Sequence, residues 1–233
     1  ARSSRQSGAT MARWLAIGNA ARNGVFAALS ARAGFTGDLR IFEGDLFPSV
    51  YNLSPDPAAL VDGLDERPVL PEVSFKPWCA ARQTIAASQA LREIVEGGVS
   101  PSHMKELVVY VPSLYLRMVD HGPVAGERMS HLTSVAYQLA LAALAPEKMI
   151  EIDPLSDSVP EEVRAFMGRV TVEADDELLW HYPKSWPARL VVTTPEGKRE
   201  KLVVHVPGDP ERPFDEPQIA ALFKTMGLAL PTQ

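Results

Sequence analysis

The feature that most constrains the fold is the alternation of strand-like and helical segments between residues 72 and 208. Short runs rich in β-branched residues predict strands, at "EVSF" (72–75), "KELVVYVP" (105–112), "VTVEAD" (170–175), "RLVVTT" (189–194) and "EKLVVHV" (200–206). Longer runs with apolar residues at helical spacing predict helices, over 80–98, 127–144 and 160–170. The last two strands flank Pro195-Glu196-Gly197, which predicts a hairpin.

Helical segments lie on both sides of this unit. Residues 9–33 predict one long helix that ends at Gly34 and carries a stripe of Ala and Gly, a surface that allows close approach of another helix. Residues 40–70 predict short helices, one of them with Asp56 as N-cap and Pro57 at its first position. "DEPQIAALFKTMG" (215–227) predicts a closing helix that starts at Asp215 or Glu216.

The sequence therefore predicts an α+β protein in which helical segments, in residues 1–71 and 209–233, flank an α+β unit of residues 72–208. The stripe on the first helix is expected to meet helices of a partner chain or of a second copy.

Composition excludes several classes of protein. The formal net charge of -6 argues against binding to nucleic acid or to a membrane surface. No apolar run approaches the length of a membrane span, and the single cysteine excludes an internal disulfide, so a reducing, cytoplasmic location is expected. The five histidines are scattered and nucleotide-binding motifs are missing, so no metal and no cofactor are expected.

One short stretch, "FKPWCAARQT" (75–84), suggests chemistry. It places Lys76 and Arg82 in an apolar, small-residue segment where a strand is expected to lead into a helix. Two surface side chains would explain the pattern, and so would a site for an anionic ligand. Residue composition alone leaves both readings open.

Several motifs, in order along the chain, resemble the MmgE/PrpD family. "SGATMARWLAIGNAARNGVFAALSARAGFTGDLRIFEG" is similar to the family's central helical segment, with its small-residue G-[RN]-A-A-x-x-G and later G-F-T-G. "VSFKPWCAARQTIAA" is similar to the family's V-S-x-K-P-Y-P-C-C-R-x-T-H-A-A, and "TSVAYQLALAAL" to its F-S-L-P-Y-x-V-A helix. The family includes 2-methylcitrate dehydratase, cis-aconitate decarboxylase and iminodisuccinate epimerase.

The resemblance implies that helical segments of a larger all-α domain flank a smaller α+β lid domain. Residues 1–71 would belong to the helical domain, residues 72–208 would form the lid, and the helix in residues 209–233 would return to the helical domain. It also implies a lyase or isomerase that acts on a small di- or tricarboxylate by acid–base chemistry, without a metal or cofactor. Lys76 would clamp a substrate carboxylate or transfer a proton, and Tyr137 would act as donor or acid. The resemblance places Arg22, Asn19, Arg82 and Cys79 as substrate-binding residues, with Arg22 as a second carboxylate clamp. Lys76 and Arg22 are expected to face a common cleft between the lid and the helical segments.

Each of these residues also has a structural reading. Arg22 could be a solvated side chain, Arg82 an ion-pair partner, and Tyr137 a core residue; Cys79 without a nearby base is more often packing than nucleophile. His131, six residues before Tyr137, is expected to be structural and to lie on a different face of the same helix.

Two departures from the family pattern matter. Ile85 stands where the family has a histidine. The family's N-terminal helical half, which supplies further acids and histidines to its active site, lies outside this sequence. The chain is therefore expected to work with that half, as a separate chain or a missing segment, in a homodimer or hetero-oligomer. The alternative is a catalytically incomplete module that binds a partner protein.

Overall fold

The computed structural model describes residues 12–38, 40–41, 43–64, 66, 68–151 and 158–227. They divide into two units, one ending at Pro71 and the other beginning at Glu72, and each is described by itself. The C-terminal helix is grouped with the second unit. Its return to a helical domain of a larger protein stays a prediction.

The first unit is helical. It contains α1 (Ala12–Arg32), α2 (Leu46–Tyr51) and α3 (Pro57–Val61). Helix α1 confirms the predicted long helix and ends before Gly34, whose φ of 93° suits a residue without a side chain; residues 9–11 of that prediction lie outside the described residues. Asp56 caps α3 as predicted, because its carboxylate accepts a hydrogen bond from Ala58 N at 2.9 Å.

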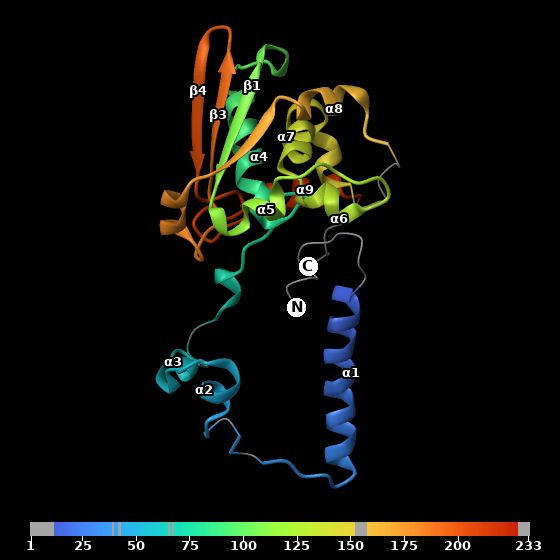
Figure 1. The fold of residues 1–233 in the computed structure, drawn as a ribbon, viewed down its shortest axis with the longest axis vertical. Coiled ribbons are helices and arrows are strands. Elements are labelled where there is room, and N and C mark those ends of the chain that lie inside the picture. Colours follow the sequence, from blue (N-terminus) through green and yellow to red (C-terminus); the bar gives the residue numbers. More distant parts are fainter. Residues whose placement is uncertain are drawn as a thin grey trace. The chain divides into compact units, whose positions relative to one another are not determined.

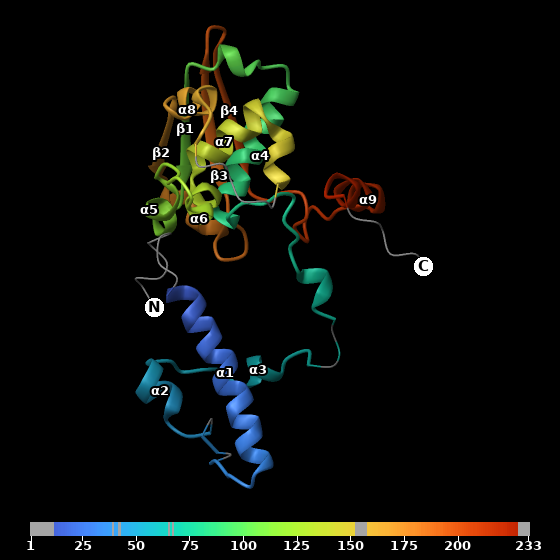
Figure 2. The same cartoon turned by 90° about the vertical axis from the view of Figure 1, so that its right-hand side faces the viewer.

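The second unit combines helices with one sheet (Figures 1 and 2). Its elements in chain order are α4 (Arg82–Glu96), β1 (Glu106–Val111), α5 (Leu116–Val119), α6 (Arg128–Thr133), α7 (Val135–Leu144), α8 (Glu161–Met167), β2 (Val170–Ala174), β3 (Ala188–Thr194), β4 (Gly197–Val203) and α9 (Glu216–Thr225). The sheet order is β2-β1-β3-β4, with β1 parallel to β2 and antiparallel to β3. The mixed α+β class is thus confirmed, as is the predicted hairpin of β3 and β4.

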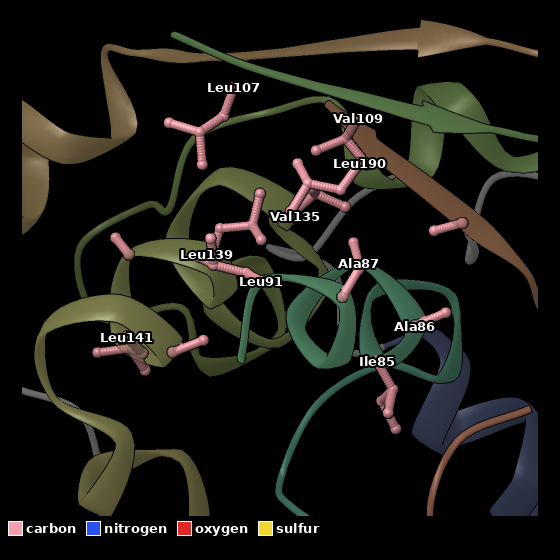
Figure 3. Close-up of a cluster of buried hydrophobic side chains, with 14 of the residues drawn as sticks. Ile85, Ala86, Ala87, Leu91, Leu107, Val109, Val135, Leu139, Leu141 and Leu190 are labelled. Atoms are coloured by element: carbon pink, nitrogen blue, oxygen red, sulfur yellow. The ribbon is translucent and has the colours of Figure 1, made fainter. Parts of the chain in front are cut away.

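The core lies between one face of the sheet and helices α4 and α7. Alternate strand residues such as Leu107, Val109 and Leu190 point to this face and are fully buried (Figure 3). Leu91 of α4 and Leu139 of α7 meet them from the helical layer. The apolar stripes of two helices and one side of the sheet therefore close a single core.

Two details of the sequence prediction are wrong. Residues 72–75 form no strand: Glu72 ends a short 3-10 helix (Leu70–Glu72), residues 73–75 have no regular structure, and Phe75 N donates to Gly208 O at 2.8 Å. The predicted helix over 127–144 is two helices, α6 and α7, because Ser134 interrupts it in an extended conformation. Its hydroxyl accepts from Tyr137 N at 3.3 Å and donates to His121 O at 2.6 Å, so it caps α7 and ties the break to a preceding loop.

Truncation of the core should destabilise the second unit. Leu91→Ala removes a fully buried side chain and is expected to lower the free energy of unfolding by about 2–5 kcal/mol, measured by urea denaturation. Leu202→Ala on β4, where the side chain is 46% exposed, is the control and should change it by less than about 0.5 kcal/mol. Equal losses in the two variants would contradict this placement of the core.

Candidate functional site

A cavity of about 350 Å³ opens in the second unit beside the segment that carries Lys76. Two of its lining side chains are cationic, Lys76 and Arg128. The other lining residues are mostly apolar: Pro77, Trp78, Cys79, Ala80, Leu132, Ile150, Leu222 and Met226. A small ligand with negative groups and a hydrocarbon skeleton suits such a wall.

The segment that leads into α4 is fixed by its backbone. Cys79 N donates to Met149 O at 2.9 Å, and Ala81 N donates to Leu132 O at 2.8 Å. Pro77 restricts the residue before it to extended conformations and is itself buried. Lys76 is therefore presented by a backbone with little freedom.

The Lys76 ammonium turns back toward its own chain and donates to Ala80 O at 2.9 Å. Although the residue as a whole is exposed, partial burial of the ammonium lowers the pKa of Lys76 below its ordinary value. The Arg82 guanidinium lowers this pKa further, and Cys79 opposes the effect in part. Both effects increase the fraction of free amine at a given pH, which is the state that accepts a proton.

Arg82 does not line the cavity among the described residues. Its guanidinium forms an ion pair with Asp209, a carboxylate that is only 3% exposed. The other oxygen of Asp209 accepts from Val206 N at 2.8 Å. Direct substrate binding by Arg82 stays a prediction, but in this structure the side chain joins the start of α4 to the loop after β4.

The same loop approaches the Lys76 segment closely at Gly208. A Cβ at this position would lie 2.3 Å from Phe75 O, and the φ of 94° is one that side chains rarely adopt. Glycine here permits the hydrogen bond between Phe75 N and Gly208 O. The loop and the segment are therefore matched in shape as well as in charge.

Glu93, three turns after Arg82 on α4, forms a second link between α4 and the region of β4 and the loop that follows it. Its carboxylate accepts from Lys201 Nζ at 2.7 Å, from Arg212 Nη1 at 2.9 Å and from Gln89 Nε2 at 2.8 Å. Burial acts to raise the pKa of Glu93, but the hydrogen bonds from Lys201, Gln89 and Arg212 outweigh it and lower the pKa to about 2.

Tyr137 lies near the start of α7 and is 7% exposed. Its ring meets that of His131 edge to face, with centroids 5.0 Å apart. The expected separation of these two rings on different faces of one helix is wrong, because the break at Ser134 folds His131 back against Tyr137. Burial and, less strongly, Glu151 raise the pKa of the Tyr137 phenol. The residues that line the described cavity do not include Tyr137, so its catalytic role stays a prediction.

The remaining predicted residues fall into two groups. Cys79 lines the cavity, and its thiol donates to Ile150 O at 3.6 Å. Asn19 and Arg22 lie on α1 in the first unit and are exposed there. Their approach to Lys76 across a cleft stays a prediction.

Within the described ranges, no group of three or more His, Cys, Asp or Glu residues could hold a metal ion. None of the helices in the described part of the chain has the length and apolar character needed to cross a membrane.

The second unit is thus a mixed α+β domain with a cation-bearing cavity beside a Lys-Pro segment. The sequence profile of the MmgE/PrpD C-terminal domain matches residues 78–230, well over half of the chain. The chain therefore belongs to the MmgE/PrpD family, which comprises enzymes, among them dehydratases and decarboxylases. No curated protein matches the chain.

Two residues that the sequence analysis did not select are part of this region. Arg128 lines the cavity from the first position of α6, and nothing in "GERMSHL" distinguishes it from a solvated helix residue. Asp209 lies in "PGDPE", which is typical of an exposed turn. Its burial depends on Arg82, 127 positions away in sequence.

The Glu93 cluster predicts a pH dependence. Because the folded-state pKa lies below the ordinary carboxyl value of 4.5, the ionised group stabilises the fold above that value, and this stabilisation is lost as the pH falls toward 2. Glu93→Gln should lower the free energy of unfolding by about 1–3 kcal/mol near neutral pH and by less near pH 3, measured by urea denaturation.

Glu96→Gln is the matched control on the same helix. Glu96 is exposed and lies 3.7 Å from Arg92, so its loss should change the stability by less than about 0.5 kcal/mol at either pH. If Glu93→Gln lost as much stability near pH 3 as near neutral pH, the assigned ionisation would be wrong.

Proposed function

We propose that this chain is part of an enzyme that performs lyase or isomerase chemistry on a small di- or tricarboxylate. Dehydration, decarboxylation and epimerisation are the candidate reactions. The observation that supports the proposal is the cavity in which Lys76 and Arg128 face an otherwise mostly apolar wall. Family membership limits the reaction class, and the cavity limits the charge of the ligand.

The candidate reactions share one chemical requirement. As a bond to carbon breaks beside a carboxylate, negative charge develops on the carboxylate oxygens, and fixed cations stabilise that charge. A group that can exchange a proton must also lie beside the reacting carbon. Lysine can do either, because its ammonium binds carboxylate and its free amine accepts a proton.

We assign these roles to residues as follows. Lys76 clamps a substrate carboxylate or moves the proton, and the downward shift of its pKa is in the direction that the second role needs. Arg128 supplies a second positive charge in the cavity. Tyr137 is the candidate donor or acid, and Arg22 with Asn19 would complete the pocket from α1. The N-terminal helical half of the family would contribute the remaining groups, within a homodimer or hetero-oligomer.

A second candidate function has its own support. On α1 the apolar side chains of Trp14, Leu15, Ile17, Val25 and Phe26 are exposed in the described structure. A catalytically incomplete module would use such a surface to bind a partner protein. Turnover by the chain, alone or with an upstream helical polypeptide, distinguishes this module from an enzyme part.

The enzyme proposal is tested by turnover of citrate-like and aconitate-like acids by the complete assembly. Lys76→Ala should lower kcat/KM by the equivalent of about 2–4 kcal/mol, because a charge-assisted contact to the transition state is lost. Lys76→Arg should not restore the rate if Lys76 transfers a proton, since a guanidinium stays protonated.

Lys184→Ala is the control. The side chain of Lys184 is 81% exposed, does not line the described cavity and forms an ion pair with Glu211. It should leave kcat/KM unchanged. If Lys76→Ala kept the kcat and KM of the unaltered protein, the cavity would have no part in the proposed function.

A further inference from the structure

We propose that Asp209 is a positioning residue for the Lys76 amine. Through its ion pair with Arg82 it fixes the segment from Phe75 to Arg82, and it balances the guanidinium charge that lies near the amine. This inference rests on the proposed function of Lys76, but its central residue, Asp209, belongs neither to the family pattern nor to the cavity lining.

The geometry supports a positioning role. The loop of residues 206–212 contacts the Lys76 segment at both ends: Gly208 O accepts from Phe75 N, and Asp209 pairs with Arg82. The loop is itself closed, because Gly208 N donates to Arg212 O at 2.8 Å. Lys76 thus lies between two points that one loop holds.

Burial makes the ion pair the critical contact. Asp209 is 3% exposed, and Val206 N donates to its second oxygen at 2.8 Å, so the carboxylate cannot turn away from Arg82 without losing its partners. A buried charge without its counter-charge is strongly unfavourable. The orientation of Arg82 is therefore set by Asp209, and the orientation of the first turn of α4 follows.

The charges around Lys76 can be stated for each neighbouring element. Arg82 contributes from α4, Arg128 from α6 and Cys79 from the segment itself, while α9 contributes apolar Leu222 and Met226 to the cavity. The carboxylate of Asp209 offsets the charge of Arg82, with which it forms an ion pair. Loss of either member of the pair should therefore change the electrostatic potential at the amine, and the two losses should have opposite signs.

The experiment measures the rate at which acetic anhydride labels Lys76 as a function of pH, quantified on the proteolytic peptide by mass spectrometry. Asp209→Asn leaves Arg82 uncompensated, which disfavours the ammonium, so labelling near pH 8 should accelerate by roughly two- to tenfold. Arg82→Gln removes the neighbouring cation, so labelling should slow by a similar factor. Loss of structure in the loop would expose the amine in both variants and change both rates in the same direction.

Two further variants complete the design. Glu211→Gln removes an exposed acid from the same loop, whose partners are Lys184 and His205, and should leave the Lys76 rate unchanged. The double variant Arg82→Gln with Asp209→Asn restores neutrality and should label at a rate between those of the single variants. This neutral pair also covers the case in which one of the single variants does not fold by circular dichroism.

The inference would be overturned if the labelling rate of Lys76 changed in the same direction in both single variants. It would also be overturned if Lys76 were labelled as fast in the double variant as in Asp209→Asn. The measurement needs no substrate and no partner chain. It therefore separates the two proposals. Opposite changes in the labelling rate, in a protein whose complete assembly shows no turnover, would retain the positioning role and reject the proposed function. Turnover together with labelling rates that change in the same direction would retain the proposed function and reject the positioning role.

Discussion

The buried ion pair of Arg82 and Asp209 is the contact on which the local structure around the cavity depends. Its partners are 127 positions apart in sequence, and the carboxylate lies almost entirely out of water. Such a pair adds little net stability, because desolvation offsets most of the attraction, but the loss of one partner is costly. Its main effect is therefore geometric, since it allows only one arrangement of the start of α4 against the loop after β4.

The proposed function requires an acidic protein to hold an anionic ligand. The net charge of the chain is -6, so a favourable potential for a polycarboxylate would have to be local. Lys76 and Arg128, which line the cavity from two different elements, would supply it, and the apolar residues of the lining would reduce the screening by water. The fixed backbone around Pro77 limits the reorganisation needed when charge develops on a ligand.

The sequence predicted those parts of the fold that depend on local pattern. Helix α4 follows from its apolar spacing and its Gly-Gly end, and the β3–β4 hairpin from β-branched runs around a turn. The break at Ser134 was missed because apolar residues continue at helical spacing on both sides of it, while the decisive hydrogen bond goes to His121 in a preceding loop. The expected strand at 72–75 failed because its partner is a loop, so only isolated backbone contacts form.

The candidate site likewise combines residues that the local sequence identifies with residues that only the fold brings there. Lys76 and Cys79 could be selected because they lie in one short stretch that resembles a family motif, and both line the cavity. Arg128 and Asp209 could not, because their environment comes from residues distant in sequence. The substrate-binding roles of Arg22 and Asn19 stay predictions, because both residues lie on α1 in the first unit and local pattern does not determine what α1 contacts.

Protection from chemical labelling tests most directly the proposal that the cavity at Lys76 binds small polycarboxylates. Acetic anhydride labelling of Lys76 would be compared in citrate and in acetate at equal ionic strength, with Lys184 read in the same samples. Citrate should slow the labelling of Lys76 in a saturable way, whereas acetate should not. The labelling of Lys184 should respond equally to both. Equal labelling of Lys76 in citrate and in acetate would contradict the proposal that this cavity binds polycarboxylates.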